Sequence, residues 1–261
     1  MPRIQDILTS LEQQIPLGLA ESWDNVGLLL GDAQAEARGV MTCLTLTADV
    51  ADEAIAKGAN LIVTHHPILF KAVKRLTTET AEGRMLLSLV RAGVSVYSPH
   101  TAFDSAREGI NQQLSVALGL CEIQPLRPKP QSTDGAGRMG QLASPIRLDE
   151  LLSRLKSICP AERYSFVGDP GLVCQKIAVA CGAAGEFLTD AAALGCQAFI
   201  TGETRFHTCL EARSLGVGLI LVGHYASERP AVENLATMLR AQWPSLTIWA
   251  SLSESDPIQF T

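Results

Sequence analysis

With 261 residues, 47% of them hydrophobic and 18% charged, the chain has the composition of a globular protein, which excludes a disordered or fibrous one. Its formal net charge is -6 at pH 7 and its lysines and arginines are scattered, so we expect neither nucleic acid nor a membrane as a partner. Its apolar runs are shorter than the roughly 18 residues of a membrane span, and its seven cysteines lack Cys-x-x-Cys spacing, so we expect a cytoplasmic protein without a disulfide framework or a thiolate zinc site.

The predicted elements alternate between helix and strand. Residues 1–14 have the pattern of an amphipathic helix that contains acids, unlike a signal peptide. Further along, runs rich in β-branched residues and leucine alternate with helical patterns, in the order strand 39–49, helix 50–59, strand 60–67, helix 80–93 and strand 94–100. This alternation predicts an α/β fold.

The stretch 127–140 (RPKPQSTDGAGRMG) is rich in Pro, Gly and Ser and has no apolar period, which predicts a loop between two halves. We therefore expect a first α/β lobe over residues 1–126, a connecting loop over 127–140 and a second α/β lobe over 141–261. The N-terminal segment could pack on both lobes.

The two halves resemble each other. GANLIVTHHPILF (58–70) aligns without a gap on GCQAFITGETRFH (195–207), so that Thr64 meets Thr201. VYSPHTAFD (96–104) aligns on ILVGHYASE (220–228), which matches His100 with His224 and Asp104 with Glu228. The repeat predicts two similar α/β lobes that face each other.

All five histidines lie at or just past the carboxyl end of a predicted strand: His65, His66, His100, His207 and His224. Open α/β sheets bind ligands at that edge. Imidazole nitrogen and carboxylate oxygen are ligands of Zn, Mn, Fe, Co or Ni, and paired metals in hydrolases lie about 3.5–4 Å apart. We predict a site at this edge for one or two divalent transition-metal ions.

Spacing suggests which side chains hold the metal. His65 and His66 are neighbours on extended chain, so they suit two ions, or one ion with the other ring supporting it. His224 and Glu228 share one face of a helical turn, and His100 and Asp104 could do the same. Only some of these groups need to bind metal while the others orient the ligands. Our preferred metal ligands are His65, His66, Asp104, His224 and Glu228.

Several ordered motifs, including ESWDNVGLLLGD, THHPILF, YSPHTAFD, ITGETRFH and VGHYASER, resemble the Nif-three-like family, whose members are often labelled GTP cyclohydrolase 1 type 2. The resemblance runs from about residue 3 to 250. It implies two α/β domains, a dinuclear metal centre in the cleft between them and homo-oligomers, commonly hexamers. It also implies the same five metal ligands, and supporting or substrate-facing roles for His100, Glu203 and His207. Where the family usually has HTNLD, this chain has Ala102 and Phe103.

Asp24 and Asn25 precede Gly27 in SWDNVG. They could reach the cleft and support the ligands, or serve as a turn or a hydrogen-bonded brace.

Two functions follow from a metal pair. The first is a metal-dependent hydrolase of a nucleotide or phosphoester, in which Glu203 or His207 moves protons. The sequence shows no nucleotide-reading motif, so the substrate, GTP included, stays open. The second is a non-enzymatic protein that binds a metal or small molecule for regulation or delivery.

Overall fold

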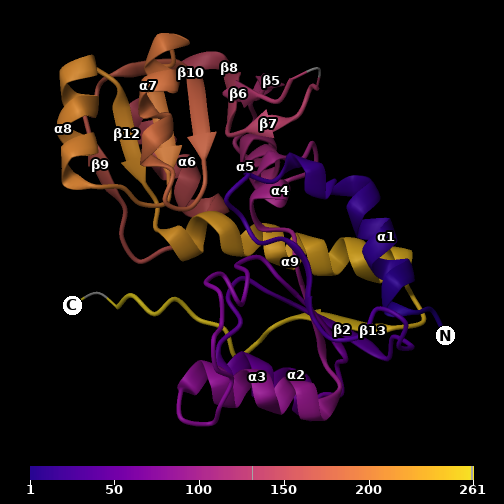
Figure 1. Ribbon diagram of the computed structural model, residues 1–261. Helices are drawn as coiled ribbons and strands as arrows, with labels where there is room; N and C mark the ends of the chain where they lie inside the picture. Colours follow the sequence, from indigo (N-terminus) through magenta and orange to yellow (C-terminus); the bar gives the residue numbers. More distant parts are fainter. Residues whose placement is uncertain (131, 260) are drawn as a thin grey trace. The chain divides into compact units, whose positions relative to one another are not determined.

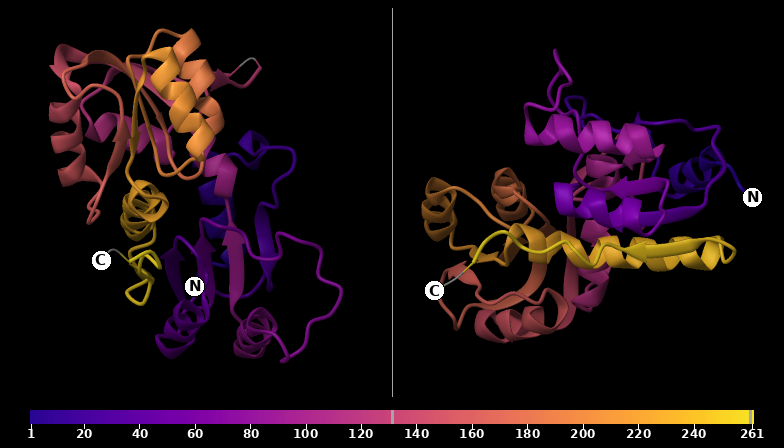
Figure 2. Two further views of the ribbon diagram at one scale, coloured as in Figure 1. Left: turned by 90° about the vertical axis from the view of Figure 1, so that its left-hand side faces the viewer. Right: turned by 90° about the horizontal axis from the view of Figure 1, so that it is seen from below.

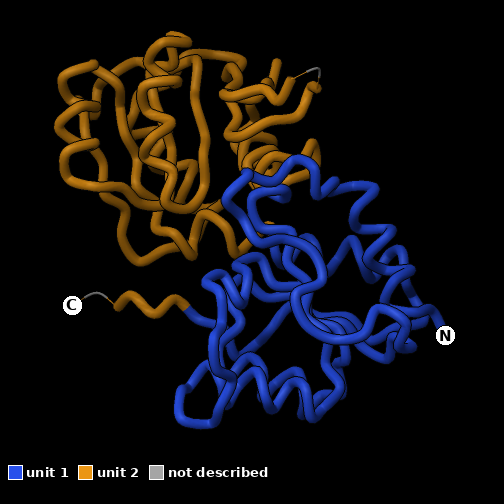
Figure 3. Tube along the Cα trace, in the orientation of Figure 1, with its two compact units in different colours: residues 1–103, 232–255 blue, residues 104–231, 256–261 orange. Residues whose placement is uncertain are grey.

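The computed structural model describes residues 1–130, 132–259 and 261. It divides into two compact units (Figure 3): unit 1 contains residues 1–103 and 232–255, and unit 2 contains residues 104–231 and 256–261. The chain leaves unit 1 within helix α4 (His100–Ser105) and returns to it within helix α9 (His224–Gln242). Gln131 of the predicted connecting loop and Phe260 of the predicted second lobe lie outside the described residues.

Unit 1 is built on a five-stranded sheet in the order β1-β4-β3-β2-β13. β13, β2, β3 and β4 are parallel neighbours, and β1 runs antiparallel to β4. The strands are β1 (Gly27–Leu30), β2 (Gly39–Cys43), β3 (Leu61–Thr64), β4 (Ser95–Ser98) and β13 (Thr247–Ala250). Every residue of β2, β3 and β4 is buried, as expected for parallel strands covered on both faces.

Helices cover both faces of this sheet. α2 (Ala48–Ala56) and α3 (Ala81–Ala92) lie side by side (Figure 1) and pack their apolar sides against Met41 of β2. The next residue, Thr42, points to the opposite face, where its hydroxyl donates to the carbonyl oxygen of Val232 in α9 at 3.0 Å. Helix α1 (Ile4–Gln14) also belongs to unit 1 and buries a stripe made of Ile4, Ile7, Leu8 and Leu11.

Unit 2 is built on a six-stranded sheet in the order β5-β8-β10-β11-β12-β9. Its centre, β10, β11 and β12, is parallel, and β8 and β9 are antiparallel to their neighbours β10 and β12. The strands are β5 (Cys121–Gln124), β8 (Arg138–Arg147), β9 (Ser165–Val167), β10 (Val173–Ala180), β11 (Ala198–Thr201) and β12 (Gly218–Leu221). A separate hairpin pairs β6 (Arg127–Pro128) with β7 (Gly135–Ala136).

Alternating residues of the central strands fill two cores. Ile177 and Val179 pack with α5 (Ile110–Ala117) and α6 (Leu148–Ile158), whereas Ala178 and Ala180 pack with α7 (Leu188–Ala193) and α8 (Phe206–Leu215). This two-residue period places one helix layer on each side of the sheet (Figure 2). The predicted α/β class is therefore confirmed.

The order of elements repeats along the chain. Leaving short 3-10 turns aside, α1-β1-β2-α2-β3-α3-β4-α4 is followed later by α6-β9-β10-α7-β11-α8-β12-α9. In each repeat the last three strands are parallel, and the first strand is antiparallel to the last. The similarity seen in the sequence is thus a repeat of topology, with His100 and His224 at the start of the last helix of each copy.

The unit boundaries differ from those expected at 127–140. That stretch lies inside unit 2, where β6 pairs with β7 and Arg138 begins β8. Residues 232–255 belong to unit 1 because β13 pairs with β2. Within the described part of the chain, no helix combines the length and apolar character that a bilayer span requires.

Candidate metal centre

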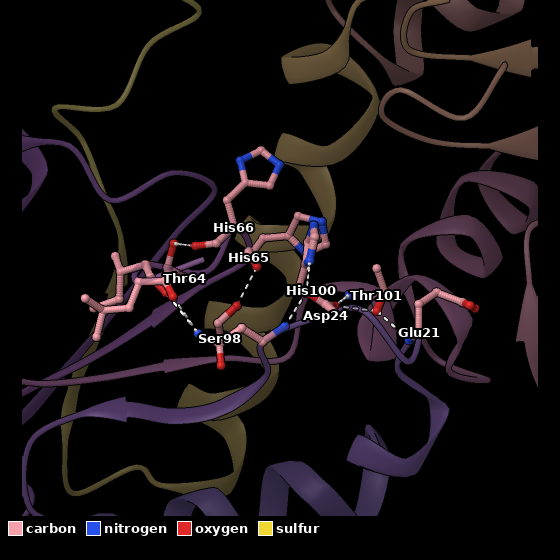
Figure 4. A network of polar contacts seen from close by, with 11 residues as sticks. Glu21, Asp24, Thr64, His65, His66, Ser98, His100 and Thr101 are labelled. Carbon is pink, nitrogen blue, oxygen red and sulfur yellow. Dashed lines mark hydrogen bonds and ion pairs between the residues drawn. The ribbon is translucent and has the colours of Figure 1, made fainter. Parts of the chain in front are cut away.

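Three histidines of unit 1 gather at the carboxyl ends of two neighbouring parallel strands (Figure 4). His65 and His66 directly follow β3, and only Pro99 separates His100 from the end of β4. The ring centroid of His65 lies 5.1 Å from that of His66 and 5.2 Å from that of His100. One ring nitrogen from each histidine lies within 4.8 Å of the other two. Three imidazoles at this spacing can converge on one metal ion.

Asp24 fixes the ring of His100. Its Oδ1 lies 2.8 Å from Nδ1 of His100, while its Oδ2 accepts hydrogen bonds from the backbone N–H and the hydroxyl of Thr101. Burial would raise the pKa of Asp24, but the hydrogen bonds from His100 and Thr101 outweigh it and lower the pKa to about 2. Near neutral pH the ionised carboxylate therefore accepts a hydrogen bond from Nδ1–H of His100, and in the neutral ring the lone pair of Nε2 is available to a metal.

The double histidine is held by side-chain and backbone bonds. Thr45 Oγ1 lies 2.8 Å from Nδ1 of His66 and so orients that ring. His65 is 3% exposed, and its carbonyl oxygen accepts a 2.7 Å hydrogen bond from the hydroxyl of Ser98 at the end of β4. The backbone N–H groups of His65 and His66 continue the pairing with β2 beyond the end of β3. Both rings therefore project from a defined backbone.

Unit 2 carries a second cluster in the matching position of its repeat. His224 begins α9, and its Nδ1 lies 3.0 Å from Oε1 of Glu203, which follows β11. Its Nε2 lies 3.1 Å from Oε2 of Glu228, one helical turn further along. The contact with Glu228 raises the pKa of His224 to about 9; burial opposes this and Glu203 adds to it. This cluster favours a positive charge between its two carboxylates.

Glycine makes room for the Glu228 carboxylate. Gly182 follows β10 with φ +69°, and a Cβ built there would lie 2.3 Å from Oε1 of Glu228. The backbone N–H of Gly182 donates to the hydroxyl of Ser227 at 3.0 Å, which ties the end of β10 to α9. Sequence patterns did not predict a role for Gly182, although a glycine just past a buried strand signals a close approach of another group.

Asp104 lies in unit 2 near the end of α4. The side-chain amide of Asn111 donates to the carbonyl oxygen of Asp104 at 3.0 Å and its Oδ1 accepts from the backbone N–H of Cys181 at 2.7 Å. Burial raises the pKa of the Cys181 thiol well above its usual value, and the charges of Glu228 and Asp104 add to this. Asn111 thus links α4 to the end of β10.

The structure divides the predicted site residues between the units. His65 and His66 share the unit 1 cluster with His100, for which the sequence predicted only a supporting role. Asp24 contacts His100, as a supporting residue would, and Asn25 is a brace whose amide donates to the carbonyl of Leu69 at 3.1 Å.

In unit 2, His224 contacts both Glu203 and Glu228. His207 is exposed on α8 beside Phe206, with the ring centroids 6.1 Å apart. Thr45, Asn111, Ser227 and Gly182 were missed because each acts through a partner distant in the sequence.

The residues of both clusters fit the divalent transition metal predicted from the sequence. Unit 1 offers three imidazoles, one of them oriented by a carboxylate as is usual for metal-binding histidines. Unit 2 offers an imidazole beside a buried carboxylate in surroundings that favour positive charge. A donor set of nitrogen and oxygen does not distinguish among Zn, Mn, Fe, Co and Ni.

Comparison with known proteins agrees with the motifs. A protein of Clostridium perfringens named "GTP cyclohydrolase 1 type 2 homolog" is 32% identical over 260 residues, which cover 99% of each chain. The "Protein NIF3 homolog" of Schizosaccharomyces pombe is 33% identical over 257 residues, covering 92% of this chain and 91% of the relative.

The same agreement holds for the fold. The crystal structure of Staphylococcus aureus protein SA1388 matches with a TM-score of 0.91 and 28% identity, covering 100% of this chain and 99% of the other. The profile of the family Duf34/NIF3 (NGG1p interacting factor 3) matches residues 2–257. The chain therefore belongs to the Duf34/NIF3 family.

Proposed function

We propose that this protein binds divalent transition-metal ions through its histidine and carboxylate clusters and hydrolyses a nucleotide or another phosphoester. The observation that carries the proposal is the group of three imidazoles in unit 1, with the Nδ1 of His100 held by the ionised Asp24. With Nδ1 of His100 bonded to Asp24, its Nε2 is left to bind a metal together with the rings of His65 and His66.

We include two ions in this proposal, because each unit contributes its own set of ligands. His65, His66 and His100 form one set, while His224, Glu228 and Asp104 form the other. That both sets serve one dinuclear centre is part of the proposal; it rests on the repeat and on the family resemblance. The relatives named GTP cyclohydrolase 1 type 2 homolog support a nucleotide as the substrate.

The roles of the side chains follow from their contacts. A bound divalent metal supplies the Lewis-acid charge that activates water near neutral pH. Asp24 holds the proton of the neutral His100 ring on Nδ1, so that Nε2 is the nitrogen left to bind the metal. Glu203 is half exposed and bonded to Nδ1 of His224, so it can pass a proton between that ring and solvent.

Metal content tests the binding proposal. We expect His65→Ala, His100→Ala and Glu228→Ala to lose bound metal when measured by mass spectrometry. His207→Ala is the matched control, because His207 is an exposed histidine on α8, and it should keep the wild-type metal content. Retention of wild-type metal by the His65 and Glu228 variants would overturn the assignment.

Turnover tests the hydrolase proposal. Metal-loaded protein is assayed with nucleotides and generic phosphoesters, alongside His65→Ala at the same concentration. Hydrolysis by the wild type that disappears in the variant supports the enzyme. Tight metal binding without turnover of any of these substrates would favour the non-enzymatic binding protein instead.

A further inference from the structure

Two large aromatic side chains lie exposed beside the histidine cluster of unit 1. Trp23 is 61% exposed and Phe70 is 51% exposed, and their ring centroids lie 6.1 Å apart at an interplanar angle of 76°. The ring of Trp23 also lies 6.3 Å from that of His100, edge to face. Exposed apolar side chains grouped at a candidate site indicate a surface that binds a ligand or a partner.

The two rings are held by the residues that organise the cluster. Asp24, next to Trp23, bonds His100, and Asn25 donates to the carbonyl oxygens of Ile68 and Leu69 beside Phe70. Leu69 has φ +55°, a strained conformation that this bracing maintains. The segment 23–25 therefore fixes the rings of Trp23 and Phe70 relative to the imidazoles of the unit 1 cluster.

Phe70 is also a wall of a pocket in unit 1. The pocket has a volume of about 490 Å³, within the range of small-molecule sites. Its lining is mostly apolar, with the polar side chains of Thr47, Lys71 and Glu82 and with the aliphatic side chains of Leu46, Ile68, Leu69 and Met85. Pro67, which directly follows the double histidine in the chain, also lines the pocket.

The geometry points to Trp23 and Phe70 as the residues that hold the planar heteroaromatic ring of the substrate, with the pocket beside Phe70 receiving the ring's edge. Two nearly perpendicular aromatic rings offer one face for stacking and one edge for a T-shaped contact, which suits a flat aromatic ring. A mostly apolar lining with few polar groups suits a ring that carries a few polar atoms at its edge. This inference rests on the proposed function and names the part of the substrate that is recognised.

Calorimetric titration with nucleotides tests the inference. The probes are adenosine 5′-monophosphate, guanosine 5′-monophosphate and ribose 5-phosphate, the last having the same sugar phosphate but no base. Since stacking is tolerant of base identity, both nucleotides should bind more tightly than ribose 5-phosphate. Trp23→Ala and Phe70→Leu should weaken nucleotide binding by about 5- to 100-fold and leave ribose 5-phosphate binding unchanged.

Two variants serve as controls. Trp23→Phe keeps an aromatic face and should bind nucleotide within about threefold of the wild type. Phe206→Ala removes an aromatic ring that is 72% exposed in unit 2, and it should bind nucleotide like the wild type. Metal content is measured for each variant, and every titration is repeated after chelation, so that loss of ring binding is distinguished from loss of metal.

The inference is overturned if ribose 5-phosphate binds as tightly as the nucleotides, or if Trp23→Ala and Phe70→Leu bind them like the wild type. It is also overturned if Trp23→Ala changes the oligomeric state by size-exclusion chromatography without changing nucleotide affinity, because a second copy of the chain would then cover these rings. Ring binding that persists in metal-free protein supports it even if the metal proposal fails.

Discussion

Asp24 Oδ1 lies 2.8 Å from Nδ1 of His100, although the two residues are 76 positions apart in the sequence. Unit 2 contains the equivalent relationship, in which Oε1 of Glu203 lies 3.0 Å from Nδ1 of His224. Each repeat therefore starts its last helix with a histidine whose Nδ1 is held by a carboxylate from elsewhere in the chain. The carboxylates come from non-equivalent positions, so the two copies reach the same arrangement by different routes.

Removing the Asp24 carboxylate should weaken metal binding. Asp24→Asn keeps the size of the side chain but loses the charge that fixes the Nδ1 proton of His100, and Asp24→Ala loses every bond to His100 and Thr101. We expect metal affinity to fall by about 10- to 100-fold, with the alanine variant affected more. Competition with a chromogenic chelator measures this. Asp52→Asn, at an exposed site on α2, is the control, and equal affinities in all four proteins would refute the role given to Asp24.

Gly182 allows a matched comparison with Gly195. Both have positive φ, +69° and +75°, but a Cβ at Gly195 meets nothing within 4 Å, whereas one at Gly182 would meet Glu228. Gly195→Ala should cost about 1 kcal/mol for the backbone conformation alone. Gly182→Ala should cost about 1–3 kcal/mol more and also weaken metal binding, because Glu228 must move. Chemical denaturation and metal content measure the two effects. Equal behaviour of the two variants would show that Glu228 has free space.

Arg138 stabilises the end of α4 from inside unit 2. It is 2% exposed, and its guanidinium donates to the carbonyl oxygens of Ser105, Ala106, Gly135 and Gly137. Arg138→Met would leave these buried acceptors without a donor, so we expect a loss of about 3–5 kcal/mol in the free energy of unfolding. Arg154→Met removes an exposed arginine paired with Glu150 in the same unit and should cost under about 0.5 kcal/mol in the same urea titration. A similar small cost for Arg138→Met would contradict this account.

Local sequence patterns were sufficient for the central strands and for the histidine positions. The β-branched and leucine-rich runs before Thr64 and Thr201 form buried parallel strands because their side chains fill both faces of a covered sheet. The hydroxyls of Thr64 and Thr201 each lie within hydrogen-bond distance of a carbonyl oxygen just past the end of the neighbouring parallel strand, that of Leu44 at 3.3 Å and that of Gly182 at 3.2 Å. The alignment that paired these two threonines therefore reflects a shared local structure.

Long-range pairing could not be predicted in this way. β13 lies near the C-terminus and pairs with β2, and the local pattern of Thr247–Ala250 does not indicate which strand it pairs with. The same limit applies to the contact between the Asp24 carboxylate and His100, since the pattern SWDNVG is equally typical of a simple turn. The sequence predicts a loop over 127–140, where the structure has a hairpin, because the hairpin strands are two residues long, too short for a period-2 signal.

Glu53 should make the stability of unit 1 depend on acid pH. This buried carboxylate accepts hydrogen bonds from Lys57, Trp249, Ser251, Leu252 and Ser253. Burial would raise the pKa of Glu53, but the bonds from Lys57 and the 249–253 segment outweigh it and hold the pKa well below its ordinary value of 4.5. The stabilisation is therefore complete above the ordinary pKa and is lost as the pH falls through the lowered one.

Glu53→Gln isolates this contribution. At pH 7 we expect the variant to lose about 2–3 kcal/mol in the free energy of unfolding, since it replaces a charged acceptor with an amide. The difference from the wild type should narrow steadily as the pH is lowered from 5 towards 2, because protonation of Glu53 then removes the same charge from the wild type. Glu79→Gln, at an exposed site in unit 1, should follow the wild type at every pH. A difference that stays constant or widens on acidification would mean that Glu53 contributes through its shape and not through its charge.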